Sequence, residues 1–517
     1  FFLSKTLGRF APNRIYFSGQ CPRTPKQRRP SHLRGRRPSF MAAACCAIRG
    51  ILPTTTTTRG RPAARGSSRA RLASATSTSS SPSPPSFPVP QRTPHSGYHR
   101  VVGFPRPFFE GWYFRVTLPE QRDNVSLIYH VYDPDLPHSA RRGAGAQVCS
   151  PGGKYIFRES TAVENFIAEP HELALRMRIP PAKGGRAAAG GGGSAAGKDG
   201  GGEFFEVVEG GARHRGRLLR GTESSEDPAV WPPEKCAQDV SWDISMRAVT
   251  GYGPPGTGSG VAGSTAGWLS ALPVFEPHYQ ITMAHGLASG WVETDGVRTT
   301  FEDCPAYSEK NWGGAGFPIK WFWVQCNSFK DAPGLSLTAT GGNRGVVVVP
   351  GMREEVAAVI LHLGDGTFFP FLPIGGGGNS DNNSSGGNGG VWGEQLPPLL
   401  GDPAEVNWDI SPWGSWRITA TTSRHEIEVT AFADPLSSHP GTVLRAPQDD
   451  TSAGMAPLCV ESFKGRLTVS LWALEPGTGR RGAVILDAVT SDSAAVEVGG
   501  GPWYSPWVGR GGLRGPL

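Results

Sequence analysis

The sequence predicts an all-β protein made of two barrel or sandwich units in tandem. Three observations support this prediction. Short segments rich in β-branched and aromatic residues alternate with Gly, Pro, Asn and Asp, which is typical of strands joined by turns. Apolar residues at helical spacing are scarce. Two features also recur in the same order in both halves of the chain, which indicates an internal duplication.

The recurring features are a strand with paired aromatic residues and a six-residue motif. Trp112–Val116 is followed by Val240-Ser-Trp-Asp-Ile-Ser245, and Trp321–Gln325 is followed by Val406-Asn-Trp-Asp-Ile-Ser411. One six-residue match could arise by chance, but the shared order favours duplication. We place the boundary between the two units near residues 264–273.

The first 92 residues predict a leader rather than part of the folded protein. Residues 1–95 contain 17 Lys and Arg and no acid, which leaves 34 basic and 44 acidic residues, a net charge of −10, for residues 96–517. The basic pI therefore does not indicate nucleic-acid binding. An acid-free stretch rich in Arg, Ser, Thr, Ala and Pro is typical of an organelle transit peptide, with Met41 as a candidate start. The alternative is a basic arm that binds an anionic partner.

The predicted domains follow from these boundaries. We expect a first β-domain over residues 93–270, a second over 271–509, and a frayed tail over 510–517. Two Gly-rich stretches, 184–202 and 375–390, are expected to be flexible surface loops. No apolar run approaches the roughly 18–20 residues of a membrane span, so any membrane contact should be peripheral.

Strands are expected throughout both domains. In the first domain they are Phe108–Leu118, Val125–Tyr132, Ala146–Cys149, Lys154–Phe157, Leu173–Ile179 and Phe204–Val208. In the second they are Tyr279–Thr294, Val297–Phe301, the Trp321 strand, Leu335–Thr340, Val356–Leu363, Trp416–Ala420, His425–Phe432, Leu467–Leu474, Ala483–Val489 and a last segment, Ala494–Trp503.

The eight cysteines point to neither a disulfide framework nor a metal site. Three lie in the leader, and the other five have no Cys-x-x-Cys spacing and leave an odd residue unpaired. Disulfide scaffolds and zinc sites need paired spacings, so we predict neither.

The stretch Tyr307–Cys326 is the most distinctive part of the chain. Glu309 and Lys310 stand side by side, followed by a Gly-rich turn and an aromatic strand. Residues two apart in a strand share a face, so one face should carry Trp321, Trp323 and Gln325 and the other Phe322, Val324 and Cys326. Two interpretations remain open: a binding site for an apolar ligand with one polar end, or a buried strand with an ion pair at its end.

Several segments together resemble the tocopherol cyclase family. They are Thr93–Tyr98, Phe108–Phe114, Pro273–His278, Tyr307–Gly314, Lys320–Gln325, Ser411–Gly414 and Val496–Trp503. The resemblance spans about residues 93–507. It departs from the family only in the leader and in the two Gly-rich stretches.

The resemblance implies a fold, a reaction and a location. The fold is two tandem lipocalin-like antiparallel β-barrels, or strongly curved sheets. The reaction is closure of a phytyl-benzoquinol to a chromanol by an intramolecular lyase or isomerase that needs no cofactor and no metal. The location is the chloroplast, at lipid globules or the inner envelope, with peripheral contact to the lipid and no nucleic-acid partner.

Such a ring closure needs a carboxylic acid that stays protonated in an apolar site and can protonate an alkene. Glu309 is the first candidate, and a surface ion pair with Lys310 is the alternative. Glu276 and His278 could act as acid and phenol base, or form a satisfied turn pair. Asp303 and Glu110 are further acid candidates; the Glu110-Gly-Trp112 segment resembles the Gly-x-Trp that plugs lipocalin barrels.

The cation formed by protonation is stabilised by aromatic faces. Trp312, Trp321 and Trp323 are the candidates for this role, with core packing as the alternative. Tyr307 could orient the quinol hydroxyl, and Lys310 and Gln325 complete the candidate substrate-binding set. Two other functions remain open: a non-catalytic lipid or pigment carrier, and a carotenoid hydratase-like enzyme in which water captures the cation.

Overall fold

A computed structural model describes residues 95–101, 106–180, 202–221, 227–228, 230–254, 263–265, 276–314, 316–345, 353–373, 402–433, 441–447, 454–503 and 505–514. The predicted leader, the 375–390 loop and nearly all of the 184–202 loop lie outside these residues. The described residues form strands and three short 3-10 helices, with no α-helix. No helix among them is long and apolar enough to cross a membrane. The all-β prediction is confirmed.

The first sheet has the strand order β4-β3-β2-β1-β11-β10-β9-β8-β7-β6-β5. All its neighbouring strands are antiparallel. The strands are β1 (Phe109–Leu118), β2 (Asp123–Tyr132), β3 (Gly143–Ser150), β4 (Lys154–Ser160), β5 (Phe166–Ala168), β6 (Leu175–Ile179), β7 (Glu203–Val208), β8 (Arg213–Leu219), β9 (Asp239–Thr250), β10 (His278–Thr294) and β11 (Val297–Gly313), and the 3-10 helices are η1 (Val163–Asn165), η2 (Glu209–Gly211) and η3 (Pro233–Lys235).

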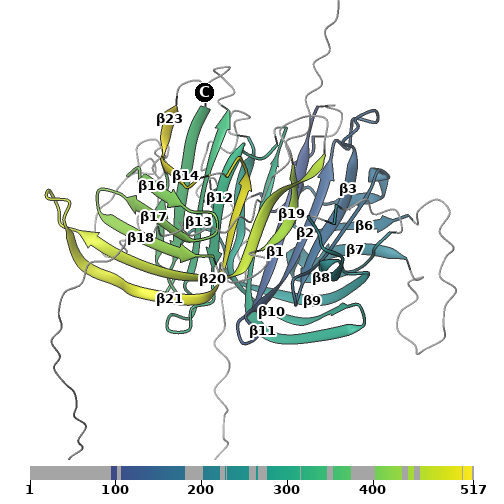
Figure 1. The fold of residues 1–517 in the computed structure, drawn as a ribbon, viewed down its shortest axis with the longest axis horizontal. Coiled ribbons are helices and arrows are strands. Elements are labelled where there is room, and N and C mark those ends of the chain that lie inside the picture. The colour runs from purple at the N-terminus through teal and green to yellow at the C-terminus, as the bar shows by residue number, and fades with distance from the viewer. Residues whose placement is uncertain are drawn as a thin grey trace, which may run out of the picture. The chain divides into compact units, whose positions relative to one another are not determined.

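The second sheet has the order β15-β14-β13-β12-β21-β20-β18-β17-β16-β22, with β19 paired to β20 and β23 to β14. Its strands are β12 (Lys320–Cys326), β13 (Ser336–Gly345), β14 (Arg353–His362), β15 (Phe368–Phe371), β16 (Glu405–Ile410), β17 (Ser415–Thr421), β18 (His425–Phe432), β19 (Thr442–Pro447), β20 (Met455–Leu474), β21 (Arg481–Gly500), β22 (Trp507–Arg510) and β23 (Gly512–Arg514). Both sheets are strongly curved antiparallel arrays of strands (Figure 1).

The change from one sheet to the other falls later than the sequence predicted. The strands β10 and β11 follow the proposed boundary at 264–273, yet they pair with β9 and β1 of the first sheet. The chain enters the second sheet only between Gly313 and Lys320. The reason is long-range pairing: β11 completes the first sheet beside β1, and no local sequence signal records that contact.

The two sheets share a strand order, which supports duplication. In each, a four-stranded meander (β1–β4 or β12–β15) lies beside a long strand that returns from the end of the unit (β11 or β21). The six-residue motif does not mark this relationship. Trp242 lies on β9, three strands from β1, whereas Trp408 lies on β16, five strands from β12. The motif therefore recurs on non-equivalent strands.

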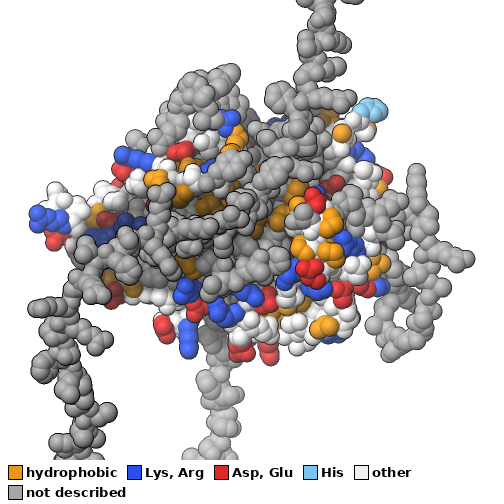
Figure 2. Space-filling model, in the orientation of Figure 1, with side chains coloured by type: hydrophobic (Ala, Val, Ile, Leu, Met, Phe, Trp, Pro, Cys, Tyr) orange, Lys and Arg blue, Asp and Glu red, His pale blue; other side chains and the backbone are white. Residues whose placement is uncertain are grey.

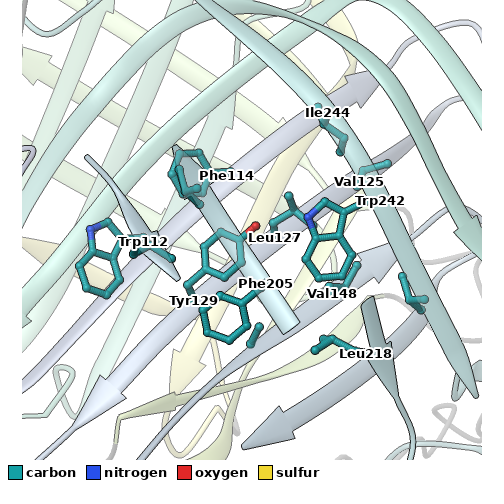
Figure 3. Packing of buried hydrophobic residues seen from close by; sticks show 14 of the residues in the cluster. Trp112, Phe114, Val125, Leu127, Tyr129, Val148, Phe205, Leu218, Trp242 and Ile244 are labelled. Atoms are coloured by element: carbon teal, nitrogen blue, oxygen red, sulfur yellow. The ribbon is translucent and has the colours of Figure 1, made fainter. Parts of the chain in front are cut away.

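Each sheet curls around an apolar core of its own. Strand alternation directs one face inward, as the regularly alternating burial along β6 and β16 shows. In the first sheet, large rings fill the interior, among them Trp112, Phe114, Tyr129, Phe205 and Trp242 (Figure 3). A second core, which includes Phe322, Trp408 and Trp416, fills the second sheet. On the face seen in Figure 2, acidic and basic side chains of the described residues are interspersed.

The first core makes a stability prediction. Phe205 is fully buried, and its ring centroid lies 5.1 Å from that of Tyr129. Phe205→Ala should lower the free energy of unfolding by about 3–5 kcal/mol, because it removes a large apolar side chain and leaves a cavity. Denaturant unfolding measures this. Val297→Ala, at a residue 70% exposed, is the control and should change it by less than about 0.5 kcal/mol. Equal effects would contradict the packing described.

Candidate active site

A third buried cluster lies between the two sheets, with residues from both. Its apolar members come from both sheets and include Ile281, Tyr307, Trp321, Trp323 and Phe463. Three carboxyl groups, those of Glu309, Glu461 and Glu497, belong to the same region, since each bonds to an aromatic residue that lines it.

Strand register places these carboxyls in two facing rows. In the first sheet, Glu309 on β11 pairs with Tyr113 on β1 and with Ile281 on β10. In the second, Glu497 on β21 pairs with Trp323 on β12 and with Glu461 on β20. Paired residues share a face of their sheet. Because side chains alternate along a strand, both rows of residues face the region where the two sheets meet. The residues next to them in the chain face away from this region, toward the core of their own sheet.

Glu309 is held by side chains from both sheets. Its Oε2 accepts hydrogen bonds from Tyr279 Oη at 2.6 Å and Tyr307 Oη at 2.7 Å, both in the first sheet. It also accepts one from Trp323 Nε1 at 3.0 Å, in the second. With three donors on Oε2, a proton on this carboxyl belongs on Oε1.

Burial lets Glu309 keep its proton up to about neutral pH. Burial, helped by the charge of Glu497, raises the pKa of its carboxyl from 4.5 to about 7, against the opposing effect of its three hydrogen-bond donors. Desolvation outweighs hydrogen bonding here because the residue is only 8% exposed. A protonated carboxyl beside Trp323 and Tyr113, whose rings lie 5.6 Å apart, is a candidate general acid.

Glu461 and Glu497 form a second acidic pair. Glu497 Oε1 accepts a hydrogen bond from Trp321 Nε1 at 2.6 Å, and burial raises its pKa to about 7. Glu461 is fully buried; its Oε1 accepts a hydrogen bond from Tyr113 Oη at 2.7 Å, and burial together with the charge of Glu497 raises its pKa well above the ordinary value. Two adjacent carboxyls cannot both ionise cheaply, so this pair retains a proton.

Five of the residues predicted from the sequence meet in this region. They are Tyr307, Glu309, Trp321, Trp323 and Gln325. The predicted alternation along β12 is confirmed, since Phe322, Val324 and Cys326 pack in the core of the second sheet. The site residues stand on the opposite face, toward the first sheet.

A second group of predicted residues lies away from Glu309 and comprises Lys310, Trp312 and His278. Lys310 is fully buried and forms an ion pair with Glu110, not with its neighbour Glu309, because consecutive residues of β11 face opposite sides. Trp312 stacks against His99 at 4.0 Å between centroids and against His278 at 5.0 Å. Burial lowers the pKa of His278 to about 4, so this ring is neutral at pH 7.

Glu276 and Asp303 also lie apart from Glu309. A carboxylate oxygen of Glu276 accepts a hydrogen bond from the backbone N–H of Gly314 at 2.5 Å, and Arg106 lies 4.0 Å away. Asp303 is exposed on β11, where its backbone N–H donates to Ser289 Oγ. Trp112 is buried in the first core, with Lys310 Nζ 5.3 Å from its ring.

Sequence reasoning missed Glu461 and Glu497, and also Tyr113, Tyr279 and Arg115. A signal was present for the two acids: each interrupts an apolar strand, in Val460-Glu-Ser and Val496-Glu-Val. An acid at an inward position of a strand is rare unless it is partnered or functional. Their proximity to Glu309 was not readable, since it depends on packing between residues more than 150 positions apart.

Comparisons with known proteins show the family of the chain. The family model described as "Tocopherol cyclase-like" matches residues 106–383 and 391–500. The chain belongs to this family. A "Probable tocopherol cyclase, chloroplastic" of Oryza sativa subsp. japonica is 38% identical over 430 residues, covering 81% of this chain and 80% of the rice protein. The "Tocopherol cyclase, chloroplastic" of Zea mays is 38% identical over 438 residues, covering 82% and 81%.

Among solved structures, the kievitone hydratase of Nectria haematococca aligns with a TM-score of 0.36 and 10% identity, covering 80% of this chain and 99% of that one. Across the part of the chain that the structure describes, no group of three or more His, Cys, Asp or Glu is arranged to hold a metal ion.

The raised pKa of Glu309 predicts a pH-dependent stability. Between its ordinary pKa of 4.5 and about 7, the folded protein keeps a proton that the unfolded chain has lost. The free energy of unfolding therefore contains a contribution that decreases as pH rises through this window. Glu309→Gln should reduce that slope by about 1.4 kcal/mol per pH unit, because one titrating group is removed.

Denaturant unfolding from pH 4 to 8 measures the slope, and exposed Asp303→Asn is the control. If Glu309→Gln and Asp303→Asn have the same pH profile, Glu309 does not titrate near neutrality.

Proposed function

We propose that this protein is a tocopherol cyclase, an intramolecular lyase or isomerase that closes the chromanol ring of a phytyl-benzoquinol. The observation that carries the proposal is Glu309, a buried carboxyl with a raised pKa that is held between aromatic side chains where the two sheets meet. Membership of the tocopherol cyclase-like family and 38% identity to two named tocopherol cyclases support it.

The reaction begins with proton transfer from Glu309. Oε1 donates its proton to the less substituted carbon of the tail's first double bond, so that one C–H bond forms and the π bond breaks. Oε2 keeps its three hydrogen bonds and stabilises the carboxylate that forms. Because those donors are already in position, little reorganisation accompanies the step.

The tertiary cation is then captured by the adjacent phenol oxygen. A C–O bond forms and the phenol O–H bond breaks, which releases one proton. Glu497, with a pKa of about 7, is suited to accept that proton in its ionised form. Substrate and product have the same atoms and oxidation state, so the stoichiometry requires no cofactor.

Aromatic faces stabilise the cation before it is captured. Trp323 is the central candidate, because its ring lies 5.6 Å from that of Tyr113 and 6.0 Å from that of Tyr307, and its N–H bonds to the acid. Each such face contributes roughly 0.5–2 kcal/mol. The same residue thus serves both the proton donor and the cation.

The proposed location is the chloroplast, at lipid globules or the inner envelope. The two plant relatives are named chloroplastic, and the acid-free leader has transit-peptide composition. A phytyl-benzoquinol partitions into lipid, so the enzyme should meet its substrate at a lipid surface through peripheral contact.

Glu309→Gln tests the acid directly. The amide keeps an oxygen for Tyr279, Tyr307 and Trp323 but supplies no acidic proton. Conversion of a phytyl-benzoquinol to the chromanol by purified protein should fall at least about 100-fold, the usual contribution of a general acid. The thermal unfolding midpoint should change little.

Asp303→Asn should retain full activity and is the matched control. Retained turnover in Glu309→Gln would exclude Glu309 as the acid. A product heavier by one water would indicate a hydratase instead of a cyclase.

Trp323→Leu tests stabilisation of the cation. Turnover should fall about 10- to 30-fold, equivalent to about 1.4–2 kcal/mol, because an aromatic face and a hydrogen bond to Glu309 are lost. Substrate affinity should change less than about threefold, since the cation exists only during the reaction. Trp472→Leu removes a tryptophan that packs against Arg481, away from the site, and should leave turnover unchanged. An equal loss of turnover and affinity in Trp323→Leu would indicate packing alone.

A further inference from the structure

Arg115 on β1 is a buried cation whose hydrogen-bond acceptors are all neutral. The residue is 1% exposed and faces the contact between the sheets. Its Nη1 donates to Gln325 Oε1 at 2.6 Å and to the backbone oxygen of Gln325 at 3.2 Å, and its Nη2 donates to the backbone oxygen of Ser493 at 2.7 Å. No salt bridge joins it to a carboxylate of the described residues. These contacts fix the guanidinium, and its charge partly offsets the burial-driven rise in the pKa of the nearby Glu461 carboxyl.

Two buried donors of this pair have no acceptor among the described residues. They are Arg115 Nε and Gln325 Nε2. Leaving a buried donor unpaired is costly, so two such donors on hydrogen-bonded neighbours call for an explanation. A ligand acceptor placed within reach of both donors would satisfy them.

Arg115 and Gln325 each follow, on the same strand face, a residue that lies beside Glu309. Arg115 is two residues from Tyr113 on the same face of β1, and its cross-strand partner is Tyr307, which donates to Glu309. Gln325 is likewise two residues from Trp323 on β12. Two residues of strand span about 6.6 Å, which is comparable to the distance across a benzene ring between two para oxygens.

We propose that Arg115 Nε–H and Gln325 Nε2–H bind an oxygen of the substrate's aromatic ring, and that this oxygen is the hydroxyl that does not take part in ring closure. We call the two side chains the oxygen clamp. This inference rests on the proposed function, because it assigns the orientation of a quinol in the same site.

Charge decides which of the two hydroxyls the clamp holds. The cyclising oxygen needs its lone pair to attack the cation, and two donors, one of them cationic, would withdraw that density. A guanidinium beside the forming tertiary cation would also repel it. The para hydroxyl avoids both problems, because it does not attack the cation and lies on the far side of the ring from it. With it in the clamp, the tail and the cyclising oxygen lie toward Glu309 and Trp323.

The clamp makes the ligand's second oxygen a requirement for binding. Quinol and chromanol both carry it, so both should bind through it. An analogue without that oxygen would leave both donors unpaired again, and sites of this kind discriminate strongly against such analogues.

The test compares two ligands with several protein variants. The ligands are a short-chain chromanol and the same chroman without its hydroxyl, and binding is followed by quenching of tryptophan fluorescence in the full chain. The unsubstituted protein should bind the chromanol at least about tenfold more tightly, equivalent to about 1.4 kcal/mol. Gln325→Glu keeps an oxygen for Arg115 but removes the Nε2 donor, so the preference should fall below about threefold while affinity for the deoxy compound is retained.

Arg115→Lys keeps the charge but removes Nε, and it should reduce the preference in the same way; it decides the question if Gln325→Glu does not fold. Gln147→Glu is the matched control, since Gln147 is equally buried but its amide N–H donates to the backbone oxygen of Arg445 and its oxygen accepts from Tyr155 Oη. It should retain the full preference.

Two results would overturn the clamp: no preference in the unsubstituted protein, or a full preference in both Gln325→Glu and Arg115→Lys. Failure of the proposed function would differ, because the quinol would then yield no chromanol while the binding preference and its loss in the variants remained.

Discussion

The three hydrogen bonds on Glu309 Oε2 are the interaction on which the site depends, because two come from one sheet and the third from the other. Removing a carboxyl from water favours its neutral form, and the donors limit this effect without cancelling it. The contact between the sheets thereby creates an acid that neither sheet would produce alone. The aromatic donors that hold it are also the groups suited to face a carbocation.

Packing inside each sheet explains why the proposed site lies between them. Residues such as Trp112, Phe205 and Trp242 fill the first interior, and a similar core fills the second. Each sheet therefore contributes its outward face to the site. The shared strand order places Glu309 and Glu497 at corresponding positions, each next to an aromatic residue of the first strand of its unit. Duplication thus accounts for two of the three carboxyls.

The third carboxyl breaks the internal symmetry. Glu461 on β20 occupies the position that Ile281 holds on β10, since each pairs with the carboxyl-bearing long strand beside it. The acidic pair and the raised pKa of Glu461 therefore belong to the second sheet alone. A similar asymmetry separates Arg115 from its counterpart Gln325, so one unit supplies the charge and the other the amide.

The sequence alone determined the all-β class, the family, and the faces of the Trp321 strand, because these depend on local alternation and on motifs that can be read along the chain. It also identified Glu309 as a candidate acid. Tertiary structure decided the rest. Strand alternation places Glu309 and Lys310 on opposite faces, and Lys310 forms its ion pair with Glu110. The packing of the sheets brings Glu461, Glu497 and Arg115 to the candidate site. Tertiary structure also moved the boundary between the sheets to residues 314–319. The physical reason is that strand pairing and desolvation act between residues hundreds of positions apart, and a carboxyl becomes an acid only where the fold buries it.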